Sequence, residues 1–142
     1  MDEVVGLGLL DNTQPFDEDA TALHFGEEFQ NAQPLFLSEV KVLMEAQKNN
    51  KPPHQSNTDV FDKTLQHCSR FNRIAKTDTI KDIRRALAKT TLDPFEMAQI
   101  VTLNVDDVGE CKAIIPSVTS GIDDAELYKI LVEVASIKRF QL

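Results

Sequence analysis

The stretch LDPFEM, residues 92–97, contains the features of a helix start that decide the fold. Asp93 supplies a capping carboxylate, Pro94 occupies the first helical position and Glu96 the third, so the first-turn amides can be satisfied from both ends. The same pattern recurs in IDDAEL, residues 122–127, ahead of a long apolar stripe. In both places the flanking apolar residues can form a hydrophobic staple. The two segments predict helices of an all-α fold.

Apolar residues at helical spacing predict four further helices on either side of LDPFEM. They run from about 38 to 47, from about 58 to 75, from about 77 to 90, and from 108 to 115, where Pro116 limits the last one. Five of the six helices fall within about 85 residues and have tight connections. Such helices bury their apolar stripes by packing on one another, which predicts a small orthogonal helical bundle.

The chain is expected to divide into four segments. They are a flexible acidic leader at 1–18, a partner-binding arm with the first helix at 19–48, a linker of turn-forming residues at 49–58, and the bundle at 59–142. Within the arm, the apolar piece from Ala22 to Phe25 is closed by Gly26 and predicts a short β-strand. This strand has no hairpin partner adjacent in the sequence, so it would need a sheet from elsewhere.

Composition indicates an intracellular globular protein with reduced cysteines. The chain has 142 residues, 42% of them hydrophobic. No run approaches the roughly 18 apolar residues of a membrane span, and the N-terminus lacks the basic start of a signal peptide, so we expect no membrane association. Cys68 and Cys111 fall at apolar positions of helix-like patterns. That placement predicts buried free thiols in preference to a disulfide.

The sequence supplies no recognisable catalytic, metal or cofactor motif. His24, His54 and His67 lie in three different segments, without the spacing of metal ligands. The paired aspartates at 106–107 and 123–124 stand at helix starts, where capping accounts for them better than acid/base catalysis does. We therefore expect no catalytic residue, no metal and no cofactor, and a chain that is not itself an enzyme.

Charge is distributed unevenly along the chain. The first fifty residues hold ten acidic residues and two lysines, and ten minus two accounts for the whole net charge of −8. A basic stretch follows from Lys63 to Lys89, and it could attract phosphate. Cations spread over two helices are, however, more often a solvated face. The candidates for nucleic-acid contact are Arg73, Lys81, Arg84 and Arg85.

Several short motifs occur in an order and spacing that is specific when they are taken together. They are EDA at 18–20 through Leu23 to Gly26-x-Glu28-Phe29, LSEV at 37–40, Thr64-Leu65 leading to Arg70-Phe71-x-Arg73, Thr79-Ile80, PFExAQ at 94–99, Leu103, KAxIPS at 112–117, IxDxEL at 122–127 and Phe140. In these motifs, from about Asp17 to its end, the chain resembles the fourth subunit of eukaryotic RNA polymerase II, which has a relative in the archaeal polymerase.

The resemblance implies a non-catalytic stalk subunit with a helical fold similar to HRDC domains. Such a subunit pairs in a heterodimer with the seventh polymerase subunit, an elongated protein with an OB-fold domain. The heterodimer docks on the polymerase core, supports transcription initiation and handles the emerging transcript, so RNA contact would run mainly through the partner. The expected location is the nucleus, with the cytoplasm as a second site.

The arm supplies the residues expected at the partner interface. Its unpaired strand and its apolar side chains would otherwise expose a patch, and they could lie along the partner's sheet. The interface residues are Leu23, Phe25, Phe29, Leu35, Leu37 and Val40. Two alternatives remain open, which are the equivalent stalk subunit of RNA polymerase III and a free-standing nucleic-acid-binding helical module.

Overall fold

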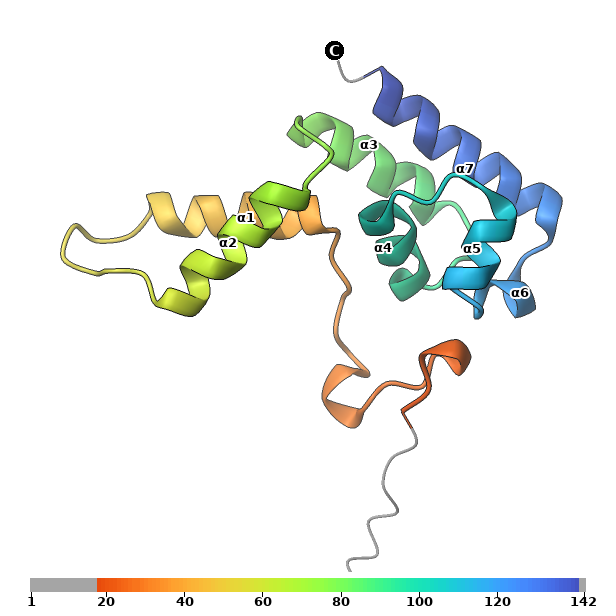
Figure 1. Cartoon of the computed structure of the whole chain (residues 1–142), viewed down its shortest axis with the longest axis horizontal. Helices are drawn as coiled ribbons and strands as arrows, with labels where there is room; N and C mark the ends of the chain where they lie inside the picture. The colour runs from red at the N-terminus through yellow and green to blue at the C-terminus, as the bar shows by residue number, and fades with distance from the viewer. Residues whose placement is uncertain (1–17, 141–142) are drawn as a thin grey trace, which may run out of the picture. The chain divides into compact units, whose positions relative to one another are not determined.

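The computed structural model describes residues 18–140, and these residues are predominantly helical (Figure 1). The chain divides into two compact units, Met1–Ala32 and Gln33–Leu142. Within residues 18–140 no helix combines the length and hydropathy that a bilayer crossing requires. The same residues contain no group of three or more His, Cys, Asp and Glu side chains placed to hold a metal ion.

The described part of the first unit is built from two single-turn 3-10 helices. These are η1, Ala20–Ala22, and η2, Glu27–Phe29. Leu23 follows η1 in the left-handed region with φ 57°. An isolated antiparallel bridge then joins Asp19 to His24 through bonds of 3.0 Å (Asp19 N–H to His24 O) and 2.9 Å (His24 N–H to Asp19 O).

The predicted strand at Ala22–Phe25 is therefore wrong, because Ala22 ends η1, Leu23 is a turn residue, and His24 forms only an isolated bridge. The Asp19 carboxylate accepts hydrogen bonds from the Thr21 amide at 2.9 Å and from the Thr21 hydroxyl at 2.6 Å. Both bonds also lower the pKa of Asp19. A side chain that bonds to the backbone two residues on turns the chain locally and competes with extended structure. Apolar composition alone did not reveal this competition.

The described part of the second unit contains seven helices. They are α1 (Leu37–Asn49), α2 (Asp59–Phe71), α3 (Thr77–Ala88), α4 (Pro94–Leu103), α5 (Val108–Ile114), α6 (Val118–Gly121) and α7 (Asp124–Arg139). The all-α prediction is confirmed, and six of these helices match predicted ones. The single turn α6 was not predicted. Helix α2 ends at Phe71, four residues before the predicted end, because the Asn72 carboxamide bonds both backbone groups of Ile74, at 3.0 Å to N–H and 2.9 Å to C=O.

Side-chain caps begin several of the helices. At α4, Asp93 accepts from the Phe95 amide at 2.9 Å, and Glu96 accepts from the Asp93 amide at 2.9 Å, which confirms the predicted capping box. At α7, Asp123 accepts from the Glu126 amide at 2.8 Å, the N-cap half of the second predicted box. These bonds satisfy first-turn donors that a helix otherwise leaves open.

The core of the second unit lies among α3, α4, α5 and α7. Helix α7 lies along α3 and α5, while α1 lies along α2 and also contacts α3 and α4 (Figure 1). Cys68 and Cys111 are buried free thiols, as predicted. Burial, with the nearby carboxylates of Glu96 and Glu110, raises the pKa of Cys111 to about 11. An HRDC-like arrangement stays a prediction.

Candidate partner interface

The segment that leads into α1 alternates between exposed and buried apolar side chains. Leu35 is 38% exposed, whereas Phe36 is completely buried in the core of the second unit. Leu37 and Val40, in the first turn of α1, are half-buried. Phe36 is thus the anchor of the segment, and Leu35, Leu37 and Val40 present apolar surface beside it.

An ion pair fixes this segment to α3. Arg84 bonds both carboxylate oxygens of Glu39, with Nε 3.3 Å from Oε2 and Nη2 in contact with Oε1. The guanidinium also lies over the Phe36 ring, 3.9 Å from its centroid. The side chains of Arg84 and Glu39 are only 23% and 19% exposed. Planar bidentate pairing with stacking on an aromatic face is the geometry that arginine favours at partly buried sites.

Arg84 and Glu39 also form hydrogen bonds with backbone groups of the segment that leads into α1. Glu39 Oε1 accepts from the Phe36 amide at 2.8 Å, and Arg84 Nη2 donates to the Pro34 carbonyl at 3.4 Å. Phe36 precedes the helix and has no side-chain oxygen with which to cap it. Glu39 therefore satisfies a backbone donor from inside the helix, and Arg84 holds the carboxylate in place.

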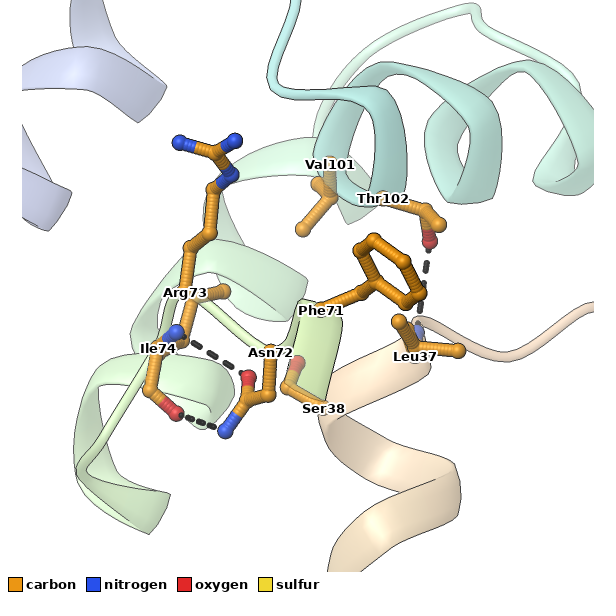
Figure 2. Close-up of a pocket in the computed structure, with 8 residues that line it drawn as sticks. All are labelled: Leu37, Ser38, Phe71, Asn72, Arg73, Ile74, Val101 and Thr102. Atoms are coloured by element: carbon orange, nitrogen blue, oxygen red, sulfur yellow. Dashed lines mark hydrogen bonds between the residues drawn. The ribbon is translucent and has the colours of Figure 1, made fainter. Parts of the chain in front are cut away.

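A small pocket lies where α1 begins, between the ends of α2 and α4 (Figure 2). The Leu37 amide donates to Thr102 Oγ1 at 3.2 Å, which connects the first residue of α1 to α4. Figure 2 shows the Phe71 ring beside Leu37, and Phe71 is 51% exposed. Ser38 Oγ is buried without a hydrogen-bond partner among the described residues. The start of α1 is thus held from two sides, by α3 and by α4.

Beyond this start, α1 and α2 pack against each other, and each leaves a large apolar side chain exposed. Leu43 is 58% exposed and Val60 is 74% exposed. Phe61 and Leu65 in α2 are half-buried, although they belong to the apolar stripe that predicted this helix. Leu43 and Val60 were not among the interface residues predicted from the sequence. Their positions on the apolar stripes of the two helices were the available signal, but the stripe alone does not say which of its members a second helix covers.

The six predicted interface residues fall in both units. Leu23 and Phe25 are half-buried and Phe29 is 59% exposed, all in the first unit. Leu35, Leu37 and Val40 belong to the second unit, where the start of α1 brings them together. All six side chains are apolar, so the chemistry that they offer to a partner is apolar contact.

Of the four predicted nucleic-acid contacts, Lys81, Arg84 and Arg85 lie on α3, and Arg73 precedes that helix. Arg84 is occupied by Glu39 and Phe36. Lys81 is exposed, and Arg85, whose side chain is 71% exposed, pairs with Asp82 at 2.7 Å. Arg73 is exposed, and the pKa of Lys138 in α7 is lowered first by burial of Lys138 and second by the nearby charge of Arg73. Lys138 donates to Asn104 Oδ1 at 2.8 Å.

Comparison with known proteins gives a consistent family. The RNA polymerase Rpb4 family matches residues 34–138. DNA-directed RNA polymerase II subunit rpb4 of Schizosaccharomyces pombe is 35% identical over 89% of this chain and 96% of its own length. Subunit 4 of Arabidopsis thaliana RNA polymerase II is 32% identical over 88% and 96% of the two chains. The corresponding Dictyostelium discoideum protein is 31% identical over 87% and 91%.

Proposed function

Because this chain belongs to the RNA polymerase Rpb4 family, we propose that it is the accessory subunit of RNA polymerase II that pairs with the seventh subunit to make the polymerase stalk. In this role it has no active site of its own and acts by binding. The heterodimer attaches to the polymerase core and supports initiation and transcript handling. Its place of action is the nucleus, with the cytoplasm as a second site.

The observation that carries the proposal is the uncovered apolar surface at and beyond the start of α1. Leu35, Leu43 and Val60 are 38%, 58% and 74% exposed, and α1 and α2 also carry half-buried apolar residues. A water-exposed apolar face of this kind favours burial against another protein. Phe29 and the half-buried Leu23 and Phe25 supply a second apolar surface in the first unit for the same partner.

Co-expression with the seventh subunit tests the proposal. We expect a 1:1 complex that survives high salt, because an apolar interface is little screened by ions. Leu35→Asp and Leu43→Asp should weaken the complex, since each places a charge in a buried contact. Ile114→Asp is the matched control, because Ile114 is 48% exposed on α5, away from this surface. A chain that stays monomeric beside the seventh subunit would refute the proposal.

Two alternatives have distinct tests. The equivalent subunit of RNA polymerase III is less favoured, because the named relatives belong to RNA polymerase II, and co-purification with one polymerase or the other decides. A nucleic-acid-binding role would rest on the exposed Lys81 and Arg85. Salt-dependent RNA binding by the isolated chain, abolished in Lys81→Glu/Arg85→Glu, would support it.

A further inference from the structure

We infer that Arg84 is a positioning residue for the partner interface: it holds Pro34–Leu37 in the conformation in which Leu35 and Leu37 meet the seventh subunit. The inference rests on the proposed function. Arg84 is one residue from the exposed Arg85, yet the two arginines have different roles. Arg84 joins Glu39, Phe36 and the Pro34 carbonyl, whereas Arg85 pairs only along its own helix, with Asp82.

The geometry shows why Arg84 controls this segment. Pro34 and Phe36 precede the helix, Phe36 in an extended conformation, and α1 itself begins only at Leu37. Helical bonds therefore do not fix Leu35, which lies between them. Arg84 binds on both sides of Leu35, to the carbonyl before it and to the ring after it. The side chain thus bridges a stretch in which an exposed residue of the proposed interface has no helix to hold it.

Loss of the guanidinium also affects the Glu39 carboxylate. The Glu39 side chain is only 19% exposed, and its charge would lose the partner that offsets its desolvation. The carboxylate would then turn toward water and release the Phe36 amide, which donates to it at 2.8 Å. The contacts of Arg84 with Glu39 and the hydrogen bond from the Phe36 amide would therefore be lost together, because both depend on the Glu39 carboxylate.

In this role Arg84 keeps the segment in its binding-competent conformation before the partner arrives. The population of that conformation then sets the apparent affinity. If the segment occupies the binding-competent conformation only about one tenth of the time, the apparent affinity falls about tenfold. Contact residues behave differently. A residue that touches the partner lowers affinity without changing the free chain, whereas a positioning residue changes the free chain first.

The test measures hydrogen exchange and binding on the same full-length variants. Arg84→Ala and Glu39→Gln should both raise amide exchange over residues 35–40 in the free chain, and both should weaken binding to the seventh subunit about tenfold. Arg84→Lys keeps the charge but not the bidentate fork, so it should fall between the wild type and Arg84→Ala. Arg85→Ala is the control and should match the wild type in both measurements. Far-UV circular dichroism confirms that each variant is folded at the temperature used.

A double variant separates a shared mechanism from two independent defects. Arg84→Ala/Glu39→Gln should bind about as weakly as either single variant, because the pair acts as a unit. Once the seventh subunit is bound, exchange over residues 35–40 should return close to the wild-type level in every variant.

Three results would overturn the inference, and they are distinguishable. Unchanged exchange in Arg84→Ala would show that Arg84 does not hold the segment. Raised exchange with wild-type affinity would show that the held conformation is irrelevant to binding. A wild-type chain that fails to bind the seventh subunit would remove the proposed function, and with it this inference, whatever the exchange measurement gives.

Discussion

Replacing Phe36 with alanine removes the side chain that anchors the start of α1. Phe36 is completely buried and belongs to the main core cluster, where it contacts the unit through apolar packing and through the Arg84 guanidinium 3.9 Å above its ring. Truncation of a buried phenylalanine to alanine costs about 3–5 kcal/mol, from lost burial and from the cavity left behind. The lost stacking overlaps with this loss, so the two contributions are not added.

The expected effect is large compared with the total stability of a domain. A loss of about 3–5 kcal/mol is a fifth or more of the roughly 5–15 kcal/mol that holds a typical domain together. For a unit of this size each kcal/mol corresponds to about 4 °C, so the melting temperature should fall by about 12 °C or more. The chain has no tryptophan and one tyrosine. Urea unfolding followed by far-UV circular dichroism is therefore the appropriate assay.

Phe140→Ala is the matched control for Phe36→Ala. It makes the same chemical change at a position that is 76% exposed just after α7. Surface substitutions of this kind usually change stability by less than about 0.5 kcal/mol. The free energies of unfolding of Phe36→Ala and Phe140→Ala should therefore differ by well over about 1 kcal/mol. A smaller difference would show that Phe36 is not a core residue and would refute the described position of α1.

Five further outcomes follow from local features. Asp93→Ala should destabilise the chain by about 1 kcal/mol in urea unfolding, because it removes the cap of α4. Cys111 should resist alkylation at pH 8 until urea is added, as followed by mass spectrometry, because burial raises its pKa to about 11. Since the folded pKa lies above the unfolded one, this thiol's contribution to stability is present below pH 9 and is lost as the pH rises toward 11. Gly121→Ala should stabilise by about 0.4–1 kcal/mol, because its φ is not positive and a Cβ there meets nothing within 4 Å. Gly109→Ala should gain less in the same urea unfolding experiments, because its Cβ would lie 3.1 Å from the capping carboxylate of Asp107.

Helix starts could be predicted from sequence because their signals are local. Thr58, Asp93 and Asp123 each cap a helix within three residues of their own position, so the sequence window contains both donor and acceptor. The incorrect strand at Ala22–Phe25 was also predicted from a short local stretch of sequence. There the decisive residue, Asp19, lay just outside the apolar piece and turned the chain through Thr21.

The candidate site could be predicted only in part, because its supports are far apart in the sequence. Leu35, Leu37 and Val40 are neighbours along the chain, and their apolar character was sufficient to propose them. The residue that holds them, Arg84, is 45 positions from Glu39. No periodicity or motif links two such positions, and only the packing of α1 on α3 brings them together.

The Arg84–Glu39 pair also changes the interpretation of the uneven charge. Glu39 belongs to the acidic first fifty residues and Arg84 to the basic stretch from Lys63 to Lys89, and the fold joins the two. A basic stretch counted from sequence therefore overstates the cations that face solvent. Reversing Arg84 would break a largely buried pair and disturb the fold, so a loss of RNA binding in Arg84→Glu would not identify a phosphate contact. Reversal of Arg85 tests that contact instead, because its side chain is 71% exposed and its pairing with Asp82 stays on the surface of α3.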